Sequence, residues 1–221
     1  MNLEDWQFQG KPNRRQKKQP MPKLSSVPAG FFFSGQLVHL ALLAVLLATA
    51  CAALDSHRLG ERDLWEIDGR AWFAIALAVP VIHQIYVWIA WRSELCFGAV
   101  TERVGFVTYQ AVFLVLLVSR PVSLILLTIA DHDSFELAIP VRLLLCMLLG
   151  LPAAYTGYSV VRYFGIARAA GIDHFDESYR TKPLVKEGIF KYTSNSMYVF
   201  GFMGLWVIAF AGASWAAVVV A

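Results

Sequence analysis

Charged residues are scarce in this sequence. They make up 16% of its 221 residues, while hydrophobic residues make up 57%; soluble domains carry about 25% charged and about 45–50% apolar residues. The apolar residues come in long uninterrupted blocks rather than at helical or strand spacing, so a water-soluble core of this size cannot hide them. The composition therefore excludes an ordinary soluble domain and predicts a protein embedded in a lipid bilayer.

Cysteine is also rare. Cys51, Cys96 and Cys146 are odd in number, far apart, and each lies inside or beside an apolar block. This spacing predicts neither a disulfide framework nor a metal site, and we expect the three residues to act as small apolar side chains. A cleavable signal peptide is not evident either, because the first apolar block begins only at Phe31 and is long enough to stay in the membrane.

Five apolar stretches approach or exceed the roughly 20 residues that a helix needs to cross a bilayer. They cover residues 31–54, 71–91, 106–129, 139–163 and 198–221. We therefore predict an all-α fold, a polytopic transmembrane helical bundle of about five spans. Most of the tryptophans near the second span (Trp65, Trp72, Trp88 and Trp91) flank span ends, as expected of an interfacial aromatic belt.

Basic residues identify the cytosolic side of the predicted bundle. Six of the nineteen Lys and Arg residues lie in residues 1–28, which also contain four prolines, and five more lie in residues 164–197. Loops rich in Lys and Arg stay in the cytosol, so both segments are predicted to be cytosolic, in a bacterial inner membrane or in the endoplasmic reticulum. The net charge of +3 is thus a topology signal and indicates no nucleic-acid partner.

Three regions follow from this pattern. Residues 1–28 are predicted to be a disordered basic cytosolic arm. Residues 29–163 are predicted to form a four-helix transmembrane region. Residues 164–221 are predicted to combine a cytosolic cofactor-binding loop with the fifth span.

The segment from Leu184 to Gly201 carries the most specific pattern. It reads Leu-Val-x-x-Gly-Ile-Phe-x-Tyr-Thr-Ser-Asn-Ser-Met-Tyr-x-x-Gly and runs into an apolar helix. This order resembles the signature Leu-Val-x-x-Gly-x-Tyr-x-x-x-Arg-(His or Asn)-Pro-x-Tyr-x-x-Gly. That signature is typical of the membrane-embedded methyltransferases that use S-adenosyl-L-methionine, among them isoprenylcysteine carboxyl methyltransferases and phospholipid N-methyltransferases.

The resemblance implies a cradle for S-adenosyl-L-methionine at the cytosolic membrane edge. Its cofactor-binding residues would be Gly188, Tyr192, Asn195, Tyr198 and Gly201. The two glycines would allow close approach, and the other three would contact polar and ring portions of the cofactor.

Two positions depart from the signature. Ser194 stands where the family usually has Arg, and Ser196 where it has Pro, so a charged contact and a rigid turn are replaced. Asn195 fits a phospholipid-type enzyme better than a prenylcysteine one. In the family, a further cofactor element follows a helix that returns to the cytosol, so we expect the C-terminal part of this domain to lie beyond Ala221.

An acidic, histidine-containing cluster precedes the cradle. An ethanolamine amine must lose a proton before it attacks a methyl group, and His174, Asp176 and Glu177 are the candidate catalytic bases. A membrane lipid of the phosphatidylethanolamine type is therefore the expected acceptor. The alternative is that this cluster is a solvated loop, as charge runs usually are.

Functions other than lipid N-methylation also fit the sequence. A prenylcysteine carboxylate would want an Arg clamp, which Arg168 and Arg180 could provide. A steroid-reductase-like, NADPH-dependent enzyme has a comparable helical layout, and a small transporter or scaffold is the non-enzymatic alternative.

Two ionisable residues, His83 and Arg120, lie within the predicted spans. His83 can serve either in a hydrogen bond between helices or in a functional site, and the hydrogen bond is the more common role for a lone histidine in a span. Arg120 precedes Pro121, which frees a backbone carbonyl, so we expect a helix kink with a local partner for the guanidinium.

Overall fold

The computed structural model describes residues 29–55 and 63–221, and within them every regular element is a helix. The predicted basic arm, residues 1–28, lies outside the described residues. The longer helices are α2 (Gln36–Asp55), α3 (Gly69–Phe97), α5 (Phe106–Ala130), α6 (Ile139–Ser159) and α9 (Met203–Ala211). The short ones are α1 (Ala29–Phe33), α4 (Ala99–Arg103), α7 (Ile166–Ala169), α8 (Glu177–Arg180) and α10 (Trp215–Val220).

The prediction of a polytopic helical bundle is confirmed. Among the described residues, four helical segments are long and apolar enough to cross a membrane: Gly30–Leu54, Gly69–Phe97, Phe106–Ala130 and Ile139–Phe164. The second extends to Phe97, beyond its predicted end at 91, because Gly98 in the left-handed region ends the helix only there. Its first turn is capped by Asp68, whose carboxylate accepts a hydrogen bond from the Ala71 amide at 2.6 Å.

The fifth apolar stretch differs from the single span expected over 198–221. Its helical part ends at Ala211, the chain turns through residues 212–214, and α10 follows. Ala213 has a positive φ of 44°, which breaks the helix, and Ser214 then caps α10 by accepting from the Ala217 amide at 3.1 Å. Helix α10 therefore packs against α2, α3 and α5 instead of continuing α9.

A buried carboxylate fixes this turn. Asp131, at the end of α5, is 1% exposed. One of its oxygens accepts hydrogen bonds from the Ser134 hydroxyl at 2.8 Å, the Ser214 hydroxyl at 2.8 Å and the Ala216 amide at 2.9 Å. A negative charge at the start of α10 also suits the helix dipole. We call this arrangement the Asp131 clamp.

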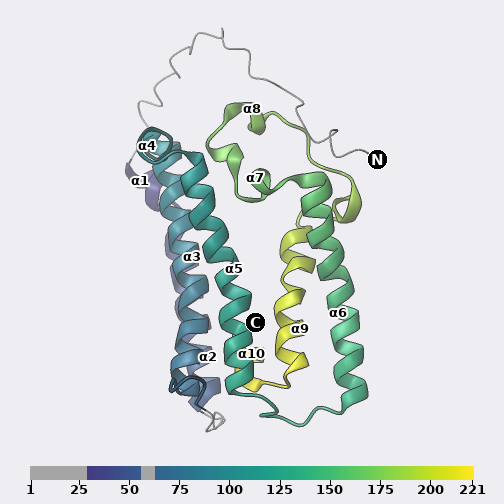
Figure 1. Ribbon diagram of the computed structural model, residues 1–221. Coiled ribbons are helices and arrows are strands. Elements are labelled where there is room, and N and C mark those ends of the chain that lie inside the picture. The colour runs from purple at the N-terminus through teal and green to yellow at the C-terminus, as the bar shows by residue number, and fades with distance from the viewer. Residues whose placement is uncertain (1–28, 56–62) are drawn as a thin grey trace.

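The long helices form two groups (Figure 1). Helices α3 and α5 pack side by side, α6 pairs with α9, and α2 contacts α10. The α6–α9 contact uses small residues: a Cβ added at Gly150, Gly201 or Gly204 would lie 3.6–3.7 Å from a side chain of the partner helix. Such residues let two helix backbones approach closely in a bilayer, where packing rather than the hydrophobic effect drives association.

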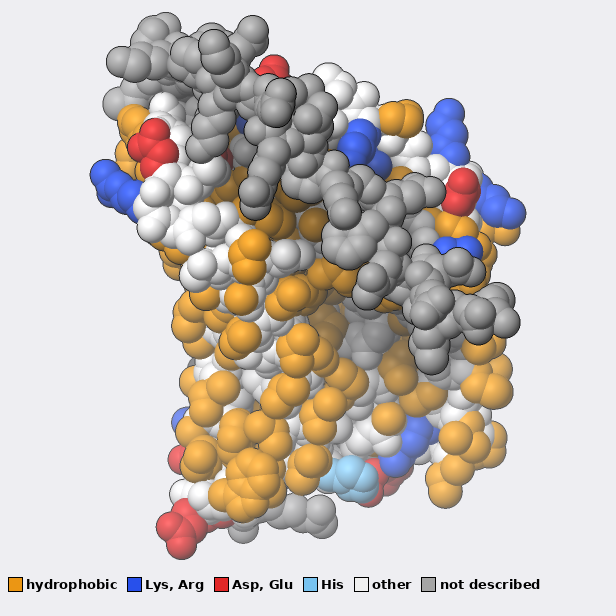
Figure 2. Space-filling model, turned by 45° about the horizontal axis from the view of Figure 1, so that its top comes forward, with side chains coloured by type: hydrophobic (Ala, Val, Ile, Leu, Met, Phe, Trp, Pro, Cys, Tyr) orange, Lys and Arg blue, Asp and Glu red, His pale blue; other side chains and the backbone are white. Residues whose placement is uncertain are grey.

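The surface supports a lipid environment. On the face shown in Figure 2, hydrophobic side chains cover the middle of the molecule, and charged side chains gather towards its two ends. Large apolar side chains are exposed along the spans, including Leu37, Val107 and Leu151 at 72–80% exposure. Apolar surface on this scale is stable only when lipid covers it.

Candidate functional site

The predicted cytosolic loop begins where α6 ends. The last turn, Val160–Phe164, has π-helical hydrogen bonding, and Gly165 then adopts a φ of +90° that turns the chain away from the helix. Single π-helical turns are frequent at functional sites. A second such turn, Met197–Gly201, opens the helix that leads into α9, so the 165–196 segment is bounded by a π-helical turn on both sides.

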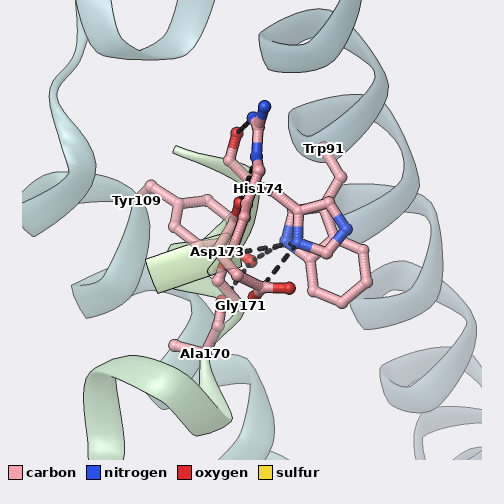
Figure 3. Close-up of polar contacts among 7 residues, drawn as sticks. Trp91, Tyr109, Ala170, Gly171, Asp173 and His174 are labelled. Carbon is pink, nitrogen blue, oxygen red and sulfur yellow. Dashed lines mark hydrogen bonds and ion pairs between the residues drawn. The ribbon is translucent and has the colours of Figure 1, made fainter. Parts of the chain in front are cut away.

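The first half of this segment docks on α3 and α5 (Figure 3). The Trp91 indole N–H donates to the Tyr109 hydroxyl at 2.7 Å, and that hydroxyl donates to the Ala170 carbonyl at 3.1 Å. Tyr109 is 1% exposed and Ala170 is fully buried. At Gly171, φ is +82° and an added Cβ would lie 2.6 Å from the Trp91 ring, so only glycine fits against it.

His174 lies flat on the same tryptophan. The His174 and Trp91 rings stack with centroids 4.0 Å apart and an interplanar angle of 13°. Its Nδ1 faces the Gly171 carbonyl at 3.2 Å and the Asp173 carboxylate at 3.5 Å. Both neighbours accept hydrogen bonds, so they favour a proton on Nδ1 and leave Nε2 as the acceptor nitrogen.

The other two predicted bases have different surroundings. Asp176 caps the short helix α8, accepting from the Ser178 amide at 2.9 Å, and it is exposed. Glu177 is exposed in the first turn of α8. The arginines considered as a carboxylate clamp are bound to the backbone: Arg180 donates to Asp173 and His174 carbonyls at 2.7 and 2.9 Å, and Arg168 donates to the Pro183 carbonyl at 3.0 Å.

The second half of the segment packs on α6 rather than on α3 and α5. Gly188 has a φ of +57°, and an added Cβ would lie 2.5 Å from the Ser159 hydroxyl and 2.8 Å from the Tyr163 ring. The backbone therefore approaches the end of α6 more closely than any other residue type permits. The contact is with the end of α6, so the structure gives this glycine a packing role, and its contact with S-adenosyl-L-methionine stays a prediction.

Two serines hold the loop around Gly188. The Ser159 hydroxyl, fully buried, accepts a hydrogen bond from the Ile189 amide at 3.1 Å. Ser196, also fully buried, donates to the Ile189 carbonyl at 3.1 Å and contacts the Thr193 carbonyl. Where the family signature has Pro, this chain thus has a hydroxyl that ties the turn together by hydrogen bonds.

The remaining predicted cofactor residues lie along this loop and the start of the next helix. Tyr192 and Tyr198 are 71% and 66% exposed, and Asn195 is exposed. The Asn195 carbonyl accepts from the Tyr198 and Val199 amides, which starts the helix. Gly201 faces Thr156 of α6, so its role in the fold is helix packing. The rings of Tyr192 and Tyr198 are available to a ligand.

The structure thus places the two predicted sets of residues on different helices. The 171–180 segment rests on α3 and α5, whereas Gly188–Gly201 rests on α6. Three side chains position the loop: Trp91, which the sequence predicts only as part of the interfacial belt, and Tyr109 and Ser159, which no sequence pattern marks. The described residues hold no group of three or more His, Cys, Asp or Glu side chains that could bind a metal ion.

These features define a class: a helical membrane protein with a glycine-containing, tyrosine-bearing ligand loop at one end of the bundle. Residues 141–221, which include α6, this loop and α9, match the model of the family described as phospholipid methyltransferase. The match confirms the resemblance predicted from residues 184–201 and supports membrane methyltransferase activity. Comparisons with curated proteins and with solved structures found no match.

Proposed function

We propose that the protein transfers methyl groups from S-adenosyl-L-methionine to the amine of a phosphatidylethanolamine-type lipid. The observation that carries the proposal is the Gly188 turn within the family-matched region, which Ser159 holds against α6 and Ser196 closes by a hydrogen bond within the loop. The two exposed tyrosines beside this turn, Tyr192 and Tyr198, offer ring faces and hydroxyl groups to an adenosyl ligand with ring and polar portions.

S-adenosyl-L-methionine supplies an activated methyl group on a sulfonium sulfur, and methyl transfer is an in-line displacement. The protein therefore has to align the lipid amine, exclude water and accept a proton. Gly188 and Asn195 would position the donor, and the apolar helices would bring the lipid sideways to the cytosolic edge of the bilayer.

The proton acceptor we propose is His174. Its Nδ1 is oriented by Gly171 and Asp173, so the neutral ring presents Nε2 to a proton from the lipid ammonium. Asp176 and Glu177 would add negative charge that favours the cationic amine and the methylated product. Because stacking on Trp91 fixes the ring, the lipid amine would have to reach His174 at the end of α3.

The arginine contacts favour an amine over a prenylcysteine carboxylate as acceptor. Arg168 and Arg180, the residues suited to a carboxylate clamp, are engaged with backbone carbonyls of the loop itself. A clamp would require these bonds to break. We therefore retain the carboxyl O-methyltransferase only as an outcome of the test.

Lipid mass spectrometry tests the proposed function. Cells that express the full chain are expected to accumulate mono-, di- and trimethylated phosphatidylethanolamine, and cells carrying the empty vector are not. Membranes from the same cells would be supplied with tritiated S-adenosyl-L-methionine and either phosphatidylethanolamine or N-acetyl-S-farnesylcysteine. Methylation of the farnesylcysteine alone would contradict the lipid proposal. Crosslinking of tritiated S-adenosyl-L-methionine to the membranes that NADPH blocks, but S-adenosylhomocysteine does not, would contradict it as well.

Replacing His174 by phenylalanine tests the proton acceptor. The variant keeps an aromatic ring on Trp91 but removes Nε2, so lipid methylation is expected to fall by about 10²- to 10⁴-fold, the usual contribution of a general base. Binding of S-adenosylhomocysteine should be unchanged. The matched control is His132→Phe, which removes another histidine beside an aspartate, 2.8 Å from Asp133 at the far end of α5. Equal rates in both variants would rule out His174 as the base.

A further inference from the structure

Arg120 is the feature that the proposed function leaves unused. It lies in α5, fourteen residues after Phe106 and ten before Ala130, or about 21 Å and about 15 Å from the two helix ends at 1.5 Å per residue. A guanidinium at this depth of a membrane span is costly and is retained where it has a ligand or a partner.

The Arg120 guanidinium has no counter-charge in the part of the chain that the structure describes. Among the described residues, no carboxylate lies within ion-pair distance of Arg120, and its guanidinium makes no hydrogen bond, including to the carbonyl freed by Pro121. The local partner expected from the sequence is thus replaced by a ring from another helix. The Arg120 guanidinium carbon lies 4.8 Å from the Phe202 ring centroid, and that ring lies 5.8 Å from the ring of Tyr198.

His83 provides a second, independent observation. It lies in the middle of α3, is only 6% exposed, and packs edge-on against Phe113 of α5 with ring centroids 4.9 Å apart. Among the described residues, its buried Nε2 has no hydrogen-bond partner. Phe113 precedes Arg120 by seven residues on α5, which is about two helical turns, so His83 packs on the helix face that carries Arg120. A buried polar atom without a partner costs free energy comparable to a lost hydrogen bond, so it points to a ligand that completes the site.

We propose that Arg120 and His83 bind the phosphodiester group of the lipid acceptor. A planar guanidinium pairs with two phosphate oxygens at once, and an imidazole N–H can donate to a third. The site lies below the Tyr198 end of the cradle, because Phe202 links Arg120 to that tyrosine. In an ethanolamine lipid, two carbons separate the phosphate oxygen from the amine, so a phosphate held here places the amine near Tyr198. Tyr109, beside His174, lies eleven residues or about 16 Å along α5 from Arg120, so the amine would give its proton to His174 before the phosphate reaches Arg120.

The inference rests on the proposed function for the identity of the lipid, but it makes its own claim about binding. Arg120 would recognise the phosphate shared by phospholipids, and the headgroup amine would be selected elsewhere. Phosphatidylethanolamine and phosphatidylglycerol should therefore both bind through Arg120. A diacylglycerol of the same chain length, which lacks the phosphate, should not depend on this residue.

The test measures the affinity of the purified full chain in detergent for four probes: dihexanoyl phosphatidylethanolamine, dihexanoyl phosphatidylglycerol, dihexanoylglycerol and inorganic phosphate. Arg120→Gln is expected to weaken binding of both phospholipids by roughly tenfold to a hundredfold, the effect of losing a charged hydrogen-bonded pair. Binding of dihexanoylglycerol and of S-adenosylhomocysteine should stay within twofold of the unsubstituted chain. Arg103→Gln, an exposed arginine in the short helix α4, is the control and should change none of these affinities.

Each other outcome overturns the proposal. Phospholipid affinity unchanged in Arg120→Gln would make Arg120 a packing residue. A selective loss of S-adenosylhomocysteine binding would assign it to the carboxylate of the methyl donor, and inorganic phosphate bound as tightly as phospholipid would make it a free-anion site. If Arg120→Gln does not fold, Arg120→Lys keeps the charge without the planar fork and should lower phospholipid affinity roughly threefold to tenfold; an unchanged affinity overturns the proposal.

His83→Phe checks the second residue, and a loss of phospholipid affinity smaller than that of Arg120→Gln is expected. The binding assay is also separable from catalysis. If expressing cells make no methylated lipid, but phospholipid binding still depends on Arg120, the proposed reaction fails and this site stands.

Discussion

Gly188→Ala is expected to abolish methyl transfer while leaving the protein inserted in the membrane. The added Cβ would lie 2.5 Å from the Ser159 hydroxyl and 2.8 Å from the Tyr163 ring, and the backbone φ of +57° is itself strained for alanine. The loop has to move away from α6, which breaks the bond from the Ile189 amide to Ser159. Binding of S-adenosylhomocysteine and lipid methylation should fall together, by at least about a hundredfold, because misplacement of the donor by 1 Å has an effect of that size.

Gly98→Ala is the matched control for this variant. Gly98 has a similar φ of +64°, but an added Cβ would meet nothing within 4 Å. It therefore adds only the backbone strain, about 1–2 kcal/mol, without the clash. If Gly98→Ala and Gly188→Ala lower methylation equally, the loss comes from general destabilisation, and the assignment of Gly188 to the cradle is wrong.

Asp131→Ala is expected to have the largest effect on stability. The substitution leaves the Ser134 hydroxyl, the Ser214 hydroxyl and the Ala216 amide without their buried acceptor. Each unsatisfied buried group costs about 1–3 kcal/mol, so the loss of the acceptor for three groups should lower the free energy of unfolding by at least about 3 kcal/mol. For a chain of this length, that corresponds to a fall on the order of 10 °C in the midpoint of thermal unfolding in detergent.

Asp133→Asn, two residues away, is the control for Asp131→Ala. It tests whether stability depends on the Asp131 hydrogen bonds or on any carboxylate in this loop. The Asp133 side chain is 54% exposed and pairs with Arg142 at 2.7 Å. Exposed ion pairs contribute about 0–1 kcal/mol, so this variant should melt within a few degrees of the unsubstituted chain. Asp131→Asn should lie between the two, because its amide oxygen still accepts hydrogen bonds. A melting point of Asp131→Ala equal to that of Asp133→Asn would refute the clamp.

The four long helices follow from the sequence because each is an uninterrupted apolar run between polar segments. The end of helix α9 at Ala211 cannot be predicted from hydropathy. Gly212, Ala213 and Ser214 are small and tolerated in a span, so hydropathy continues through them. The turn forms there because Ser214 meets the carboxylate of Asp131, 83 residues earlier in the chain. A contact over that separation leaves no signal in a local window.

The candidate site also contains residues that the sequence predicts and residues that only the fold reveals. Gly188 was found from the spacing of the motif, and its positive φ and tight contact with α6 give a physical reason for glycine at that position. Ser159 could not be found this way, since a serine near a helix end has no distinguishing local pattern. Trp91 and Tyr109 look like ordinary interfacial aromatics, and only the fold shows that their side chains bond to each other and to Ala170.

The Asp131 clamp also sets an order of events during synthesis. Asp131 enters the membrane at the end of α5, but Ser214 and Ala216, which hydrogen-bond to its carboxylate, are made 83 and 85 residues later. Until then, α3 and α5 must be held by their own contacts, and the carboxylate must stay at the hydrated edge of the bilayer. Contacts this distant in sequence form late because loop closure costs entropy. The turn between α9 and α10 is therefore secured only after residues 214–216 have been made.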